Sequence, residues 1–139
     1  MRRSMRRSML APCAILVALA MPPASALAAA EAYIISPQDG ETVRSPFVVR
    51  FGLKGMGVAP AGIEMPGTGH HHLIIDAPLP PAGQPVPFDD QHKHFGKGQT
   101  ETELSLPPGE HTLQLILGDH THVPHDPPVA SRQIRVRVE

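Results

Sequence analysis

The stretch Phe47-Val48-Val49-Arg50-Phe51-Gly52-Leu53 decides the fold, because its side chains alternate between two faces. Phe47, Val49, Phe51 and Leu53 fall on one face, whereas Arg50 and the following Lys54 fall on the other. Successive side chains of a strand point to opposite faces of a sheet, so this alternation indicates a strand with one face in a core.

Similar short apolar or alternating segments lie on either side of this strand, at residues 33–36, 70–76, 92–95, 99–106, 111–118 and 131–138. They are separated by turns and loops rich in Pro and Gly, which number 17 and 12 in the chain, and none has a helical period. Short strands bounded by such residues are typical of β-sandwiches. Taken in order as strands A to G, they predict an all-β, immunoglobulin-like antiparallel β-sandwich of about seven strands.

The first thirty residues have the layout of a cleaved secretory signal. Arg2, Arg3, Arg6 and Arg7 precede an apolar run at residues 9–21, and alanine-rich cleavage patterns follow. We therefore expect residues 1–30 to be a signal peptide and residues 31–139 to be one periplasmic or secreted domain. The single cysteine, Cys13, would be removed with the signal, so the mature chain would have neither a disulfide nor a thiolate ligand.

The charge balance excludes some classes of partner. The formal net charge is −1, and loss of the arginine-rich leader makes the mature chain more acidic. Nucleic-acid-binding proteins need basic patches, and anionic membrane surfaces attract basic segments, so we expect neither partner. After the leader, no apolar stretch is long enough to span a bilayer.

The most informative residues are the nine histidines, of which all but His111 lie in three clusters, at residues 70–72, 92–94 and 120–125. Imidazole is the commonest side-chain metal ligand. In an immunoglobulin-like order, the B–C, D–E and F–G connections lie at one end of the sandwich. The three clusters are therefore predicted to meet at that loop end.

Strand geometry selects the candidate ligands, since residues i and i+2 share a face. The candidates are His70, His72, His92, His94, His120 and His122. Such imidazole sets suit copper, zinc or nickel, and we expect copper first and zinc second. Candidate carboxylates that could orient the imidazoles are Asp76, Asp89, Asp90, Asp119 and Asp126.

Other residues have alternative explanations. Met56 and Met65 could serve Cu(I), but packing within their loop explains them as well. His71 shares the inward face of Leu73 and is expected to be a hydrogen-bonded core histidine. His111 is expected to be structural, beside the turn at residues 107–109.

Four motifs resemble those of a known family, and the resemblance extends over essentially the whole mature chain. They are the runs Gly69-His70-His71-His72-Leu73-Ile74-Ile75-Asp76, residues 92–101, residues 108–120 and residues 122–128. Together they resemble the family catalogued as domain of unknown function 4399. The resemblance implies an exported bacterial single-domain protein and transfers no catalytic residue.

Three functions stay open at this point. The first is a periplasmic protein that binds a transition-metal ion for buffering or delivery, with no catalytic residues. The second is a module of the cell envelope that binds a non-metal ligand or a protein through its loop end. The third is a metal-dependent redox or hydrolytic enzyme, for which Asp119 or Asp126 could supply a base beside an open coordination position.

Overall fold

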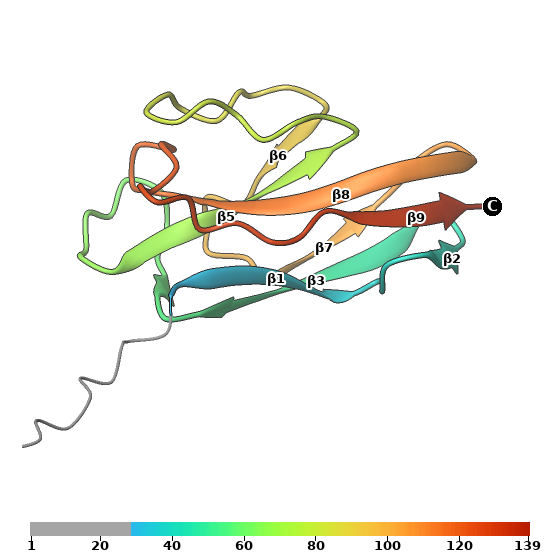
Figure 1. Ribbon diagram of the computed structural model, residues 1–139, viewed down its shortest axis with the longest axis horizontal. Helices are drawn as coiled ribbons and strands as arrows, with labels where there is room; N and C mark the ends of the chain where they lie inside the picture. Colours follow the sequence, from blue (N-terminus) through green and yellow to red (C-terminus); the bar gives the residue numbers. More distant parts are fainter. Residues whose placement is uncertain (1–28) are drawn as a thin grey trace, which may run out of the picture.

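The alternating stretch forms β3 (Phe47–Lys54), the middle strand of a three-stranded sheet. Its neighbours are β1 (Glu31–Ser36) and β7 (Glu101–Leu104), and both pairings are antiparallel. In this computed structural model, which describes residues 29–139, the sheet packs against a second sheet (Figure 1). The prediction of an all-β sandwich is confirmed.

The second sheet has six strands and carries most of the histidines. Its order is β2 (Glu41–Val43), β9 (Ile134–Val138), β8 (Gly109–Gly118), β5 (Thr68–Ile75) and β4 (Gly57–Val58), with β6 (His92–His94) paired to β5. The facing orders β1-β3-β7 and β9-β8-β5 correspond to strands A-B-E and G-F-C of an immunoglobulin-like sandwich.

The core lies between the two sheets and follows the predicted alternation. Val49 of β3 is fully buried, as are Leu73 of β5 and Leu115 of β8. The intervening residues of β5 and β8, such as Ile74 and Ile116, lie on the outer face of the six-stranded sheet, in a second small apolar cluster. Other parts of the chain cover this outer face, so the side chains on it are buried as well.

One strand departs from the expected A-to-G arrangement. In that order, the fourth strand joins the sheet of strands A, B and E, but β6 pairs with β5, the C strand. Hydrogen bonds from Ile75 N to Gln91 O and from Phe95 N to His71 O extend this ladder at both ends. The pairing brings β6 alongside the histidines of β5.

Two short strands were not predicted, and both are parallel additions at the sheet margins. β2 pairs with β9, and β4 pairs with β5. The Asp39-Gly40 turn leads into β2, and Arg135 N donates to Asp39 Oδ1 while Gly40 N donates to Arg135 O. The strands expected at 99–106 and 131–138 are shorter, at Glu101–Leu104 and Ile134–Val138.

The expected signal peptide, residues 1–30, lies outside the described residues except for Ala29 and Ala30. Within residues 29–139, no helix has the length and apolar character that crossing a bilayer requires. In Figure 1, the long loop between β5 and β6 lies over the six-stranded sheet, beside the loop that follows β8.

Candidate metal centre

Four imidazoles gather on the outer face of the six-stranded sheet. His70 and His72 come from β5, His94 comes from β6, and His122 comes from the loop after β8. Each offers one ring nitrogen, and these four nitrogens all lie within 4.8 Å of one another. This group, called the four-histidine cluster below, could hold a metal ion.

The cluster is close to a tetrahedron. Its six ring-centroid distances run from 4.6 Å, between His94 and His122, to 5.9 Å, between His72 and His122. Imidazoles bound to one ion through nitrogens at about 2.0–2.1 Å have centroids about 5.2 Å apart in a tetrahedron, but about 4.5 and 6.4 Å apart in a square. The observed spread therefore fits tetrahedral coordination better than square-planar coordination.

Strand geometry brings three of these rings together. His70 and His72 share the outer face of β5 because they are two residues apart. The β5–β6 register sets His72 opposite His94 and Ile74 opposite His92. His94 is therefore adjacent to the β5 pair, whereas His92 lies two cross-strand pairs farther away.

Two glycines leave room for the rings. A Cβ at Gly118 would lie 2.7 Å from Cε1 of His72, and a Cβ at Gly96 would overlap the ring of His94. Sequence reasoning missed both residues. The sequence signal that could have found the pair is a glycine at or just after a strand end, next to a histidine-bearing strand.

The fourth ring is placed by a tight loop anchored on Asp119. Asp119 Oδ1 accepts hydrogen bonds from Thr121 N (2.8 Å), Thr121 Oγ1 (2.7 Å) and Val123 N (3.0 Å). The backbone closes the same loop, since Asp119 N donates to Val123 O and His122 N donates to Asp119 O. His122 adopts φ of +69°, a left-handed conformation uncommon for a non-glycine residue.

The loop between β5 and β6 covers the cluster and meets the His122 loop. Val86 N donates to His122 O at 2.9 Å, and the Val86 side chain packs with Ile74 and Ile116. The ring of Phe88 lies 5.9 Å from that of His94. As a result, His70 is fully buried and His72 is only 2 % exposed.

Burial keeps His70, His72 and His94 of the cluster uncharged at neutral pH. It lowers the pKa of His70 to about 4, with further lowering by the neighbouring His122 and His94. Burial also lowers the pKa of His72 to about 3, and the pKa of His94 is lowered by burial and by His122. At neutral pH these imidazoles are therefore in the neutral form that binds metal ions.

Much of the hydrogen-bonding capacity of the rings is unused. His70 Nε2 and His122 Nδ1 are 3.0 Å apart and share one hydrogen bond. Among the described residues, His70 Nδ1, His72 Nδ1 and His94 Nε2 are buried with no hydrogen-bond partner. An unpartnered buried polar group costs about 1–3 kcal/mol of folding stability. The cluster therefore destabilises the fold, which indicates that it is kept for a function.

The other two predicted ligands lie elsewhere. His92 Nδ1 is 2.7 Å from Asp89 Oδ1, so this ring is held by a carboxylate. His120 lines a separate groove with His125. The segment from Asp119 to Val123 is a turn rather than the extended chain that the prediction assumed, which separates His120 from His122.

The site lies on the outer face of the six-stranded sheet, where His70 pairs with Gly118 at the end of β8, and it takes one ligand from the loop that follows. The candidate carboxylates are distributed over the fold. Asp119 supports the His122 loop, Asp89 holds His92, and Asp76 contacts His111 at another part of the fold. Asp90 lines a hollow beside β6, and Asp126 lines a pocket near Ala30. Met56 and Met65 line the His120 groove, and Met56 packs against the core.

His71 points into the core, as predicted, but the expected hydrogen bond is absent. Its ring packs 5.3 Å from that of Phe51, and within the described part of the chain neither ring nitrogen has a partner. Burial lowers its pKa to about 4. His71 is therefore a neutral core residue on the opposite face of β5 from the cluster.

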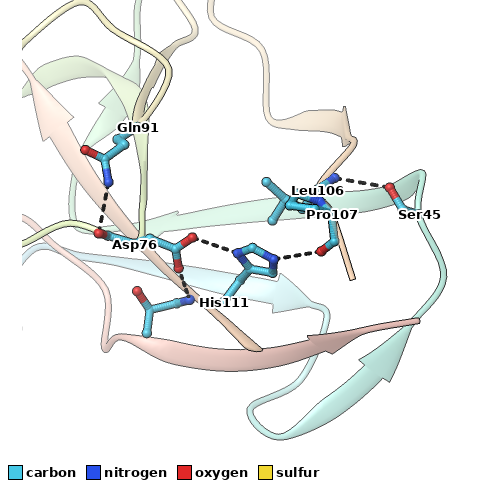
Figure 2. A network of polar contacts seen from close by, with 7 residues as sticks. Ser45, Asp76, Gln91, Leu106, Pro107 and His111 are labelled. Atoms are coloured by element: carbon cyan, nitrogen blue, oxygen red, sulfur yellow. Dashed lines mark hydrogen bonds and ion pairs between the residues drawn. The ribbon is translucent and has the colours of Figure 1, made fainter. Parts of the chain in front are cut away.

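His111 forms an aspartate–histidine pair that resembles a catalytic dyad (Figure 2). Its Nδ1 donates to Asp76 Oδ2 at 2.7 Å, but its Nε2 donates to Pro107 O at 2.8 Å. Asp76 Oδ1 also accepts from Thr112 N, and Asp76 O accepts from Gln91 Nε2. Because both ring nitrogens are occupied as donors, the pair is a structural brace, as predicted for His111.

Comparisons with known proteins identify a family but no activity. A family model described as a domain of unknown function (DUF4399) matches residues 49–139. That span includes all four histidines of the cluster as well as Asp119, Gly96 and Gly118. No curated protein and no solved structure matches the chain.

Proposed function

Because the chain belongs to the DUF4399 family, whose description assigns no activity, we propose a function from its histidine cluster. The protein binds a transition-metal ion, copper first, and acts in metal buffering or delivery. The observation that carries this proposal is the convergence of four imidazole nitrogens within 4.8 Å. The family prediction made from the sequence motifs is itself confirmed.

The fit of the cluster to an ion rests on distance and on unmet hydrogen bonding. In a tetrahedral site, nitrogens bound to one ion at about 2.0–2.1 Å are about 3.3–3.4 Å apart. The observed upper limit of 4.8 Å therefore requires the rings to close by up to about 1.4 Å when an ion binds. Metal–nitrogen bonds would then offset part of the cost of burying four imidazoles.

Copper is preferred because of charge and geometry together. The ligands are neutral, and two of them are almost completely buried. Burying an ion costs less for a monovalent than for a divalent cation, and Cu(I) accepts the tetrahedral grouping that the ring centroids form. Zn(II) also accepts that geometry and is the second choice.

Binding is preferred over catalysis. All four imidazoles of the cluster are candidate ligands, and Asp119, one of the two expected bases, accepts three hydrogen bonds that hold its own loop. A role in the periplasm or outside the cell follows from the leader-like sequence of residues 1–30 and belongs to the same proposal. The other interpretation, a non-metal interaction module, predicts partner binding that chelators do not affect.

Competition titration of the purified protein with Cu(I), Cu(II) and Zn(II) tests the proposal. We expect one ion per chain with a dissociation constant below about 1 μM, and X-ray absorption should show nitrogen ligands only. His94→Ala should weaken binding strongly, whereas His120→Ala, which removes a histidine outside the cluster, should leave it unchanged. Affinity weaker than micromolar, or equal loss in both variants, would refute a site at this cluster.

A further inference from the structure

A hollow of about 520 Å³ lies between β6 and β7, beside the four-histidine cluster. It is lined by strand residues of β6 and β7 and by the last part of the loop that precedes β6. His94, at one wall, belongs to the cluster, but the residues that shape the rest of the hollow have no part in metal binding.

The hollow marks the position of a missing strand. In an immunoglobulin-like sandwich, strand D pairs with strand E, which is β7 here. Across residues 29–139, β7 pairs with β3 alone, because β6 has moved to the edge of β5. An unpaired strand edge presents backbone N–H and C=O groups that can pair with another chain.

The walls of the hollow define two faces for an added strand. Along β7, Leu104 points inward and is 5 % exposed, whereas Glu103 points outward. At the rim, Phe88 is 86 % exposed, the most exposed large apolar side chain among the described residues. A strand placed here would meet apolar groups on one face and a carboxylate on the other.

Charge limits the identity of the added strand. The lining carries the carboxylates of Asp89, Asp90 and Glu103 against one cation, Lys93. Pairing of two copies of β7 would bring Glu101 and Glu103 close to their counterparts, and like charges on paired strands are destabilising. A basic segment from a different protein is favoured instead.

We propose that the free edge of β7 accepts an extended segment of a partner protein, in which basic and apolar residues alternate, at the position of the missing strand D. β7 has four residues, so the paired segment spans about 13 Å. Backbone hydrogen bonds to β7 give affinity, and contacts with Phe88 and Glu103 give selectivity. The proposal does not depend on metal binding.

The probe is the peptide acetyl-Lys-Val-Lys-Val-Lys-Val-amide, added to the purified, isotope-labelled protein. Nuclear magnetic resonance follows the backbone amides, and hydrogen exchange measures their protection. We expect shifts and slowed exchange at Glu101–Leu104. Methylation of alternate peptide nitrogens should abolish the effect, and a Glu-Val peptide should not bind.

Two matched variants separate recognition from general charge attraction. Glu103→Lys and Glu64→Lys make the same charge change, but Glu64 lies in a different groove. We expect Glu103→Lys and Phe88→Ala each to weaken binding about tenfold, and Glu64→Lys to have little effect. The proposal is overturned if β7 amides are unperturbed, if both lysine variants weaken binding equally, if the methylated peptide binds as well, or if β7 is already paired in a dimer without peptide.

Discussion

His72 of β5 lies directly opposite His94 of β6, with their ring centroids 5.2 Å apart. This cross-strand pair depends on β6 pairing with β5 instead of joining the other sheet. His70 extends the pair along β5, and His122 completes the cluster from the loop after β8. The geometry of the site is thus set by one strand register and one loop, and each can be perturbed separately.

The loop can be perturbed at Asp119. Asp119→Ala removes the acceptor of three hydrogen bonds, so we expect His122 to move and metal affinity to fall about 10- to 100-fold. Asp119→Asn keeps an oxygen acceptor and should lose much less. Competition titration measures the affinity, and X-ray absorption counts the nitrogen ligands. Wild-type affinity in Asp119→Ala would show that the carboxylate does not position His122.

The ring of His72 can be displaced by adding one methyl group. Gly118→Ala places a Cβ 2.7 Å from His72 Cε1, too close for an ordinary contact. We expect weaker metal binding, and a loss of stability of about 1–3 kcal/mol from overpacking. Gly57→Ala is the matched control, since its Cβ would meet only Thr68 Cγ2 at 3.5 Å. Equal metal affinity in the two variants would contradict the assigned role of Gly118.

The contribution of His111 to the free energy of unfolding should fall as pH rises. Burial alone would lower its pKa, but hydrogen bonds to Asp76 and to Pro107 O, with the charge of Asp76, outweigh burial and raise the pKa. A raised pKa stabilises the fold fully below pH 6.5, the unfolded value, and this stabilisation is lost as pH rises through the folded value. The buried histidines with lowered pKa values, among them His70, His71 and His72, act in the opposite direction, because they raise stability as pH rises through 6.5, their unfolded pKa. The contribution of His111 is therefore the difference in unfolding free energy between the wild type and a variant without the pair, and this difference should decrease from pH 6 to pH 9.

Asp76→Asn is the control for that pH dependence. It removes the charge and faces the Nδ1 donor of His111 with an amide, so we expect a loss of about 1–3 kcal/mol near pH 6. The difference in unfolding free energy from the wild type should then shrink as pH rises to 9. The buried histidines His70, His71 and His72 are present in both proteins, so their contributions cancel in this difference. A difference that stays constant with pH would show that the Asp76–His111 pair is not the source of this pH dependence.

Replacing His71 should stabilise the protein, whereas most substitutions in a protein core destabilise it. Both of its ring nitrogens are buried without a partner in the described structure. His71→Leu removes these groups at similar size, so we expect the metal-free protein to gain about 1–2 kcal/mol of unfolding free energy. Denaturant unfolding measures this gain, and metal affinity should be unchanged because His71 faces the core. A loss of more than about 1 kcal/mol would indicate that the nitrogens have a partner, such as buried water.

The fold and half of the site geometry could be predicted from local patterns. Alternation in residues 47–53 defined β3, and the i, i+2 rule put His70 and His72 on one face with His71 on the other. Both predictions depend only on the two-residue period of a strand. They are correct because β5 is a regular strand throughout these residues.

The rest of the site depends on contacts between distant residues. The choice between His92 and His94 follows from the β5–β6 register, which no local pattern encodes. The choice between His120 and His122 follows from the turn that Asp119 closes, where the two-residue period does not apply. The missing hydrogen bond of His71 likewise reflects which side chains surround it in the core, including Phe51.

The four imidazoles come from three segments that are distant in sequence, β5, β6 and the loop after β8. Any one segment of an unfolded chain therefore offers at most two of the four ligands, and the complete set exists only after β5 has paired with both β6 and β8. An ion that needs all four nitrogens cannot be acquired before that pairing. The metal ion that the protein carries is thus determined by the metal supply of the compartment in which the chain folds.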